Sequence, residues 1–343
     1  MSTTELPPLI GQSPAFLALL EEVSRLAPLA RPVLLAGERG TGKELIAQRL
    51  HFLSARWDRA FVQVNCAALA ETLLESELFG HEAGAFTGAV RRRAGRFERA
   101  HGGSLFLDEI ASASLSAQEK VLRIIEYGEM ERLGGDAVLR VDVRVIAAAN
   151  VDLPAAADAG AFRHDLLDRL AFDVLTLPPL RHRAGDIPLL AETFGRAMAV
   201  ELEWDAWPGF SRRALATLQD HAWPGNVREL KNAVERAVYR WGDPQAPVDE
   251  VRVDPFASPH RPPAPRPRAP AAGAPPPAGA TEIPDAGRPL DLDGALADLE
   301  RRLLHQALAA NRFHQRATAD HLGLTYHQLR NRLRKYNLLH QDG

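Results

Sequence analysis

Short apolar runs alternate with helix-like patterns along the first two thirds of the chain. Between about Gly11 and Gly242, stretches whose apolar positions recur at helical spacing separate several runs of consecutive apolar residues. These runs are Pro32–Ala36, Phe61–Val64, Ser104–Leu107 and Val143–Ala148. Continuous apolar runs between amphipathic helices are typical of strands that are buried on both faces of a parallel sheet. The pattern therefore predicts an α/β fold with a mainly parallel sheet.

Beyond Leu180 the apolar runs stop and only helical spacing remains. We expect helices at Ile187–Val200, Ser211–His221 and Asn226–Arg240. Such a group of helices directly after an α/β sheet indicates a small lid subdomain.

Composition then changes sharply. The stretch from 257 to 289 is rich in proline and alanine and has too few large apolar residues to form a core, which predicts an extended linker. From 290 the helical pattern returns, with Leu292, Leu296, Leu299 and Leu303 on one face of a helix that could pair in a dimer. The sequence thus divides into a short tail (1–8), a sheet subdomain (9–176), a lid (177–256), the linker (257–289) and a C-terminal unit (290–343).

Length, composition and net charge limit the class of protein. A chain of 343 residues with 46% apolar composition can form a large core, and a formal net charge of −3 restricts nucleic-acid binding to a local basic module. The first residues show no signal-peptide pattern, and no run approaches the roughly 20 apolar residues of a membrane span. We expect a cytoplasmic protein. Cys66 is the only cysteine, which excludes an internal disulfide and suggests a buried small hydrophobe.

A glycine-rich segment has the form of a phosphate-binding loop. It follows the predicted strand Pro32–Ala36 and precedes a helical run at Glu44–Phe52, so backbone N–H groups can surround phosphates at a helix N-terminus while Lys43 neutralises their charge. Its residues are Gly37, Glu38, Arg39, Gly40, Thr41, Gly42, Lys43 and Glu44. Glu44 stands where such loops usually carry the serine or threonine that binds Mg²⁺. The context predicts an ATP site whose metal relies on other groups.

Those groups follow two later strands. Asp108 and Glu109 come at the end of Ser104–Leu107, where Asp108 can bind Mg²⁺ and Glu109 can activate the attacking water. Asn150 follows the run that ends at Ala149 and could sense the γ-phosphate, although for an isolated asparagine a turn residue is the favoured interpretation. Together with the glycine-rich loop, the carboxylates predict NTP hydrolysis.

Three arginines could complete the site. Arg163 and Arg169 could reach the γ-phosphate of a neighbouring subunit, although local pairing with Asp165 and Asp168 on a solvated helix face is the simpler interpretation. Arg228 lies in the first turn of a predicted lid helix and could reach back to the nucleotide.

The C-terminal segment is the expected basic module. Residues 311–343 carry six Lys and Arg against two Asp, a net +4, and Thr325 and Gln328 form a capping box at the start of a second helix after Arg316–Leu322. With Leu324, Leu329 and Leu333 facing inward, this helix would present its polar face to DNA. The residues concerned are Thr325, Tyr326, His327, Arg330, Asn331 and Arg334.

The segment Gly84, Ala85, Phe86, Thr87, Gly88 and Ala89 is unusual for a soluble protein. Glycines flank one aromatic residue and one hydroxyl, which is poor material for a core. We expect a mobile loop that contacts a partner.

The accumulated motifs resemble those of bacterial AAA+ activators of sigma-54 RNA polymerase. GERGTGKE, NCAAL, ELFGHEAGAFTGA, GGSLFLDEI, FRHDLLDRL, LPPLRHRAGDIPLL and WPGNVRELKN occur in the order typical of that family, and GAFTGA is nearly specific to it. The resemblance implies an AAA+ ATPase with a helical lid and a Fis-type helix-turn-helix.

The resemblance also implies residue roles. Glu44 is usual in the family, Asn65 is expected to contact the Walker B glutamate Glu109, and Arg163 and Arg169 are expected to act as arginine fingers in trans. Arg228 would be the second sensor. The implied assembly is a hexameric ring, with a dimer or other lower-order form when inactive. The GAFTGA loop would bind sigma-54, with Tyr127–Leu139 as a neighbouring surface loop, for which a plain β-hairpin is also compatible.

Within the family, HFLSARW, RLAFDVLTLPPLR and LGLTYHQLR look most like the activators of the phage shock operon. This resemblance implies control in trans by the inhibitory phage shock protein A, in keeping with the short segment before the ATPase motifs. Trp57 is then the expected docking residue; the alternative is an aromatic partly buried under a loop.

The sequence is also compatible with two other functions. The chain could be a nucleotide-gated DNA-binding switch, or an AAA+ enzyme that remodels or loads onto DNA. The GAFTGA motif disfavours both.

Overall fold

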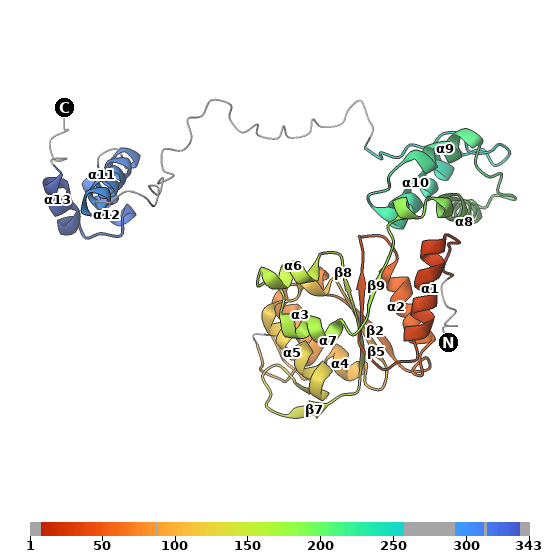
Figure 1. The fold of residues 1–343 in the computed structure, drawn as a ribbon, viewed down its shortest axis with the longest axis horizontal. Helices are drawn as coiled ribbons and strands as arrows, with labels where there is room; N and C mark the ends of the chain where they lie inside the picture. The colour runs from red at the N-terminus through yellow and green to blue at the C-terminus, as the bar shows by residue number, and fades with distance from the viewer. Residues whose placement is uncertain (1–7, 87, 257–291, 312–313, 337–343) are drawn as a thin grey trace. The chain divides into compact units, whose positions relative to one another are not determined.

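The computed structural model describes residues 8–86, 88–256, 292–311 and 314–336. The chain divides into two compact units, residues 1–261 and 262–343, and each is described by itself (Figure 1). The predicted linker and, apart from Pro8, the predicted N-terminal tail lie outside the described residues.

The first unit is built on a five-stranded parallel sheet in the order β2-β5-β8-β1-β9. The strands are β1 (Val33–Ala36), β2 (Phe61–Asn65), β5 (Ser104–Asp108), β8 (Arg144–Ala149) and β9 (Val174–Thr176). The predicted strands are all present, and the expected α/β fold is confirmed. The edge strand β9 was not predicted, because three residues with one buried side chain give no readable pattern.

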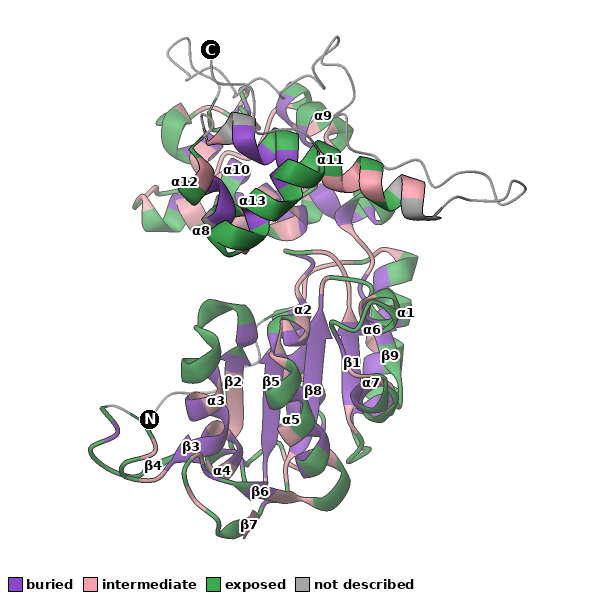
Figure 2. Cartoon of the chain, turned by 90° about the vertical axis from the view of Figure 1, so that its left-hand side faces the viewer, coloured by how far each residue is buried: buried purple, intermediate pink, exposed green. Residues whose placement is uncertain are grey.

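Helices cover both faces of this sheet (Figure 1). On one face, α1 (Pro14–Leu26) and α2 (Lys43–Phe52) pack in a core with Leu35, Phe106 and Ile146. The opposite face packs against a second set of helices, α3 (Glu71–Phe79), α4 (Arg96–Arg99), α5 (Leu115–Tyr127), α6 (Leu153–Asp158) and α7 (His164–Leu170). Figure 2 shows the central strands β5 and β8 as continuously buried, whereas the edge strand β2 is mostly intermediate.

Arg144 joins the first layer of helices to the sheet. It is a fully buried residue of β8, and its guanidinium donates to the carbonyl oxygens of Ala27 at 2.7 Å, Leu26 at 3.0 Å and Leu50 at 3.3 Å. Those carbonyls lie at the C-terminal ends of α1 and α2, where most carbonyls have no partner within the helix; of the three, Leu26 O also accepts from Leu29 N–H at 3.1 Å. Burial lowers the pKa of Arg144 to about 10, which still leaves the group charged at neutral pH.

Two small antiparallel pairs extend from the sheet subdomain. In the first, β3 (Gly80–His81) pairs with β4 (Arg93–Ala94), and in the second, β6 (Glu129–Glu131) pairs with β7 (Val138–Arg140). An isolated bridge between His81 and Leu133 connects the two pairs.

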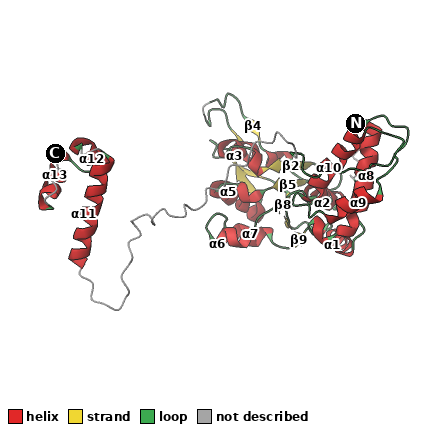
Figure 3. Cartoon of the chain, turned by 90° about the horizontal axis from the view of Figure 1, so that it is seen from above, coloured by secondary structure: helices red, strands yellow, loops and turns green. Residues whose placement is uncertain are grey.

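The lid consists of α8 (Ile187–Glu201), α9 (Arg212–Asp220) and α10 (Asn226–Trp241), which share one core around the fully buried Trp223. These helices match the predicted ones to within a residue at most ends. Figure 3 shows them as an all-helical group beside the α/β layer. Short 3₁₀ turns, η3 (Leu180–His182) and η4 (Ala184–Asp186), connect β9 to the lid.

The second unit contains α11 (Leu292–Ala310), α12 (Gln315–His321) and α13 (Tyr326–Lys335) around a small core that includes Leu304, Leu329 and Leu333. The capping box predicted at Thr325 is present: its side chain accepts from Gln328 N–H, and the Gln328 side chain accepts from Thr325 N–H at 2.9 Å. Leu296 and Leu303 are half exposed on α11.

Candidate nucleotide site and partner surfaces

The glycine-rich loop lies between β1 and α2, as predicted. Gly37, Gly40 and Gly42 all have positive φ, so the loop turns back on itself in conformations that favour glycine. Lys43 Nζ donates to the carbonyl oxygens of Gly37 at 2.7 Å and Glu38 at 2.9 Å, and burial lowers the pKa of this amine. The loop is thus already closed around the lysine that would meet the phosphates.

A cavity of about 540 Å³ lies in front of this loop. Lys43, Glu44, Asp108, Glu109 and Arg228 all line it, so the structure brings together residues predicted from three separate motifs. Burial raises the pKa of Asp108, an effect that the charge of Lys43 opposes. A buried lysine that faces two carboxylates is the arrangement expected of a phosphate site that also attracts a cation.

The partner of Asn65 differs from the expected one. Asn65 Nδ2 donates to Asp108 Oδ2 at 3.2 Å, whereas Glu109 Oε1 lies 3.5 Å from Arg39 Nε. The expected contact with Glu109 is therefore not made in this structure. The reason is geometric: Asn65 and Asp108 are paired in register on adjacent strands, and Glu109 is one residue past the strand in a left-handed conformation, φ 52°.

Asn150 follows β8 directly and is not among the residues that line the cavity. The carbonyl of the preceding residue, Ala149, accepts from Gly37 N–H at 3.2 Å, which places Asn150 beside the start of the phosphate loop.

The lid supplies lining residues that the sequence patterns did not single out. Besides Arg228, they are Phe194, Val227, Lys231, Asn232 and Glu235. Most follow Arg228 on α10 at three, four and seven residues, the spacing of a single helix face. This helical spacing from Arg228 is the sequence signal that indicates them.

Arg163 and Arg169 lie outside this cavity. Arg163 forms ion pairs with Asp165 at 2.7 Å and Glu119 at 3.4 Å, and Arg169 Nε lies 2.6 Å from Glu126 Oε1. Within one chain, Arg163 therefore makes the expected local pair with Asp165 and a further one with Glu119 of α5, whereas Arg169 pairs with Glu126 of α5 and not with Asp168. Neither arginine completes the nucleotide site of its own subunit.

The GAFTGA segment is the turn between β3 and β4, and the structure describes all of it apart from Thr87. Gly84 and Gly88 have φ of 85° and 103°, in the left-handed region, and Gly84 N–H donates to Ala89 O at 2.8 Å. Phe86 is 43% exposed, and among described rings it contacts only that of His81, in a T-shaped arrangement with 5.0 Å between centroids. An aromatic side chain is thus presented on a turn that glycines allow to bend.

The base of this loop is tied to the β6–β7 hairpin. Arg132, only 7% exposed, donates to Glu82 at 2.7 Å and Glu98 at 2.9 Å, and these hydrogen bonds, first that to Glu98 and then that to Glu82, raise its pKa. Gly134 fits so closely that a Cβ there would lie 2.7 Å from that of Ala85. The segment Tyr127–Leu139 is therefore both a β-hairpin and the neighbour of the GAFTGA loop.

Trp57 lies in the turns after α2 and is 63% exposed. The alternative of an aromatic partly buried under a loop is wrong. Exposed large aromatics of this kind are typical anchors for a protein partner.

The helix-turn-helix separates its basic residues into two groups. Arg332 and Lys335 pair with Glu300 of α11 at 3.3 and 3.5 Å. Arg330 and Arg334 are exposed and form no ion pair with a described residue, as suits groups that bind DNA. Thr325, Tyr326, His327 and Asn331 are exposed on the same short helix or at its start.

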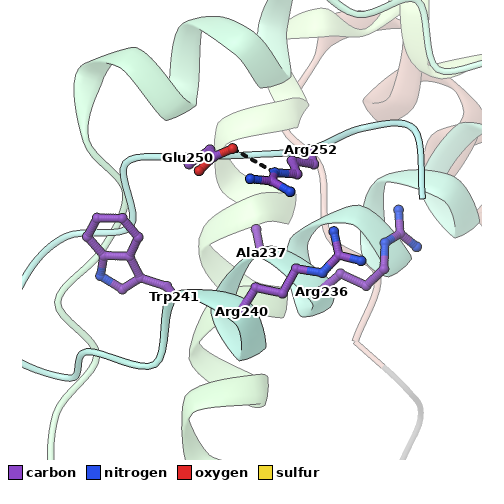
Figure 4. Close-up of a pocket in the computed structure, with 6 residues that line it drawn as sticks. All are labelled: Arg236, Ala237, Arg240, Trp241, Glu250 and Arg252. Carbon is purple, nitrogen blue, oxygen red and sulfur yellow. Dashed lines mark hydrogen bonds and ion pairs between the residues drawn. The ribbon is translucent and has the colours of Figure 1, made fainter. Parts of the chain in front are cut away.

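A further hollow, of about 300 Å³, lies at the other end of α10 from the nucleotide site (Figure 4). Its lining is Arg236, Ala237, Arg240, Trp241, Glu250 and Arg252. Arg252 Nε donates to Glu250 at 2.7 Å, so one arginine already has an anionic partner here.

Comparisons with known proteins agree with this architecture. The family models that match are the sigma-54 interaction domain over residues 9–176, the AAA+ ATPase lid domain over 181–261, and the bacterial regulatory protein, Fis family, over 295–336. The chain belongs to the sigma-54-dependent AAA+ transcriptional activators. It is therefore an ATP-binding ATPase and an activator of transcription, with sigma-54 and DNA as partners.

One relative matches along nearly the whole chain. The Psp operon transcriptional activator of Escherichia coli (strain K12) is 53% identical over 96% of this chain and 98% of its own length. The transcriptional regulatory protein ZraR of Klebsiella oxytoca is 54% identical over 67% of this chain, and the match spans about half, 52%, of that protein. Among solved structures, NtrX from Brucella abortus in complex with ATP superposes with a TM-score of 0.67 at 32% identity, covering 96% of this chain and 69% of its own.

No helix within the described residues is both long enough and apolar enough to cross a membrane.

Proposed function

We propose that the chain hydrolyses ATP in a hexameric ring and uses its GAFTGA loops to remodel the closed complex of sigma-54 RNA polymerase at promoters with an upstream enhancer. The observation that carries this proposal is the turn that presents Phe86. Phe86 is exposed, Gly84 and Gly88 on either side have left-handed backbone conformations, and the ion pair of Arg132 with Glu82 connects the turn to the rest of the ATPase subdomain. A loop that must extend and retract needs such hinges. Phe86 supplies an apolar anchor and Thr87 a hydroxyl.

Each residue of the nucleotide site has a separate role in this proposal. The loop from Gly37 to Glu44 binds the phosphates, Glu109 orients the attacking water, and Asn150 and Arg228 sense the γ-phosphate. Asn65 couples the carboxylates to the GAFTGA side of the sheet. Because Arg163 and Arg169 lie outside the cavity of their own chain, we assign them as fingers for the neighbouring subunit, which makes the ring necessary for turnover.

The donor set fits Mg²⁺. Asp108 and Glu109 present carboxylate oxygens in the cavity that Lys43 lines, and hard oxygen ligands are those that Mg²⁺ prefers. Asp108 would hold the ion, which would neutralise phosphate charge when bound.

The C-terminal unit is assigned to enhancer binding, with α13 in the major groove and Arg330 and Arg334 on bases or phosphates. The half-exposed Leu296 and Leu303 of α11 support pairing of two such units in the resting dimer or other lower-order form. We retain the division into 1–8, 9–176, 177–256, 257–289 and 290–343. We further assign the protein to the cytoplasm, where its DNA and polymerase partners are.

The 53% identical relative supports the phage shock operon as the target. We assign Trp57 as the docking residue for phage shock protein A, since its ring is exposed on the sheet subdomain. Trp57→Ala should relieve inhibition by that protein while ATPase activity without the inhibitor stays unchanged. Retained inhibition would contradict this assignment.

Transcription in vitro tests the main proposal. On an enhancer-bearing template with sigma-54 polymerase, the wild type should activate with ATP, and Glu109→Gln should bind ATP and DNA without activating. Activation by Glu109→Gln would instead indicate a nucleotide-gated DNA-binding switch. ATPase activity stimulated by DNA alone, together with indifference to Thr87→Ala, would indicate a DNA-remodelling enzyme.

A further inference from the structure

Residues of the lid form hydrogen bonds with consecutive residues of the phosphate loop. Asn226 Nδ2 donates to the Arg39 carbonyl oxygen at 3.0 Å, and Val227 N–H donates to the Gly40 carbonyl oxygen at 3.0 Å. Gly40 comes so close to the lid that a Cβ added there would lie 2.2 Å from Gly225 O. Arg183 Nη2 adds a longer contact to Thr41 O, at 3.4 Å.

Glu38 adds a charged contact at the start of the same loop. Its carboxylate accepts two hydrogen bonds from Arg181, at 2.6 and 2.9 Å, and one from Asn226 Nδ2 at 3.1 Å. These bonds, first from Arg181 and then from Asn226, lower the pKa of Glu38 to about 2. The carboxylate is therefore ionised at any pH at which the protein works, and it remains a strong acceptor.

Asn226 makes the central contacts between the lid and the phosphate loop. It is fully buried, and its Oδ1 accepts from Leu180 N–H at 2.8 Å while its Nδ2 faces the oxygens of Glu38 and Arg39. Since only the amide nitrogen can donate, these partners fix the orientation of the side chain. Its φ of 53° is left-handed, which asparagine tolerates better than most residues.

A mechanical path follows from these contacts. The carbonyl of Glu38 accepts from Lys43 Nζ, the group that would turn to the phosphates of a bound nucleotide. The side chain of Glu38 contacts Asn226, and Asn226 stands two residues before Arg228 in the first turn of α10. These contacts connect Lys43 with the helix that carries Arg228, and both residues line the same cavity.

We propose that Asn226 and Glu38 are positioning residues that hold Arg228 over the nucleotide and convey the occupancy of the phosphate loop to the lid. The proposal rests on the proposed role of Arg228 as a sensor. Neither residue needs to touch the reacting atoms, because each acts through the placement of α10.

A double-mutant cycle on ATP turnover tests this coupling. Asn226→Gly keeps the left-handed backbone and removes only the side chain, and we expect kcat/KM for ATP to fall about tenfold or more, as for a lost hydrogen bond to a charged group. In the Arg228→Ala background the same change should cost less than about twofold further, because its effect passes through Arg228. Glu203→Gly is the matched control: Glu203 is an exposed lid residue with φ 57°, and we expect its replacement to leave turnover unchanged.

The outcomes separate the two claims. If Arg228→Ala alone leaves turnover unchanged, the sensor role of Arg228 fails, and this inference fails with it. If Arg228→Ala lowers kcat/KM and Asn226→Gly lowers it by the same factor in that background as in the wild type, the two effects are independent. The sensor role then stands, and only the coupling through Asn226 is wrong. Should Asn226→Gly fail to fold, as judged by circular dichroism, Glu38→Gln gives the same cycle: it keeps the size of the side chain and removes the charge that Arg181 and Asn226 bind.

Discussion

Asn65 donates a hydrogen bond to Asp108 over 3.2 Å because the two residues end neighbouring parallel strands in register. Glu109, the next residue, turns away in a left-handed conformation and lies 3.5 Å from Arg39 of the phosphate loop. The adjacent carboxylates therefore have different partners. Asp108 is held by a residue of the sheet, whereas Glu109 is held by a residue of the phosphate loop.

The first prediction separates binding from hydrolysis. Glu109→Gln should lower turnover by about 10²–10⁴-fold, the usual contribution of a general base, while ATP affinity stays close to that of the wild type. Lys43→Ala should instead abolish ATP binding, because the amine that neutralises the phosphates is gone. Equilibrium binding and phosphate release measure the two effects. Equal loss of affinity in both variants would contradict the assigned division of roles.

A second prediction concerns the shared site. Arg169→Ala should lower turnover by about 10³–10⁵-fold if the arginine acts as a finger. Mixing inactive Arg169→Ala with inactive Glu109→Gln should recover part of the activity, because some interfaces then combine an intact Glu109 with an intact Arg169 from the neighbouring subunit. The absence of any recovery in assembled mixtures would show that Arg169 does not act in trans.

The single cysteine gives a third prediction. Burial raises the pKa of the Cys66 thiol to about 12, so at pH 8 the native protein should react with a thiol reagent only as it unfolds. The unfolded thiol ionises near pH 9, whereas the folded thiol does not, so this group removes stability progressively as the pH rises from about 9 to about 12. Rapid labelling of the native chain, compared with the same reaction in urea, would contradict the burial of Cys66.

The buried Arg144 predicts a large effect on stability. Arg144→Met removes the donor for the last carbonyls of α1 and α2 and should cost on the order of 3 kcal/mol, since hydrogen bonds to charged groups are worth about 1.5–3 kcal/mol each. Arg140→Met, at a side chain 86% exposed, should change stability by less than about 0.5 kcal/mol. Urea midpoints compare the two. A similar midpoint for both variants would show that Arg144 does not fasten these helices.

The sequence predicts the strands and the phosphate loop well because both leave local patterns. Pro32–Ala36 and Ser104–Leu107 are continuous apolar runs, and the glycines with Lys43 have a fixed spacing. The partner of Asn65 could not be predicted in the same way. Whether its amide meets Asp108 or Glu109 depends on strand register and on the left-handed turn at Glu109, neither of which the sequence shows.

The hydrogen bonds between the lid and the phosphate loop could not be predicted from the sequence either. Asn226 and Glu38 are separated by 188 positions in the chain, and the motif WPGNVREL drew attention to Arg228 alone. Only the packing of α10 against the loop shows that the buried Asn226 side chain uses both its oxygen and its nitrogen in hydrogen bonds.

Binding of sigma-54 by the GAFTGA loop during ATP hydrolysis is tested most directly by capture of sigma-54. In a gel shift with ADP and a mimic of the transferring γ-phosphate, the wild type should form a stable complex with sigma-54, and Thr87→Ala should not. The control Thr217→Ala, which changes an exposed threonine of the lid, should form the complex as the wild type does. Failure of all three proteins to capture sigma-54, with their ATPase activity intact, would contradict the account.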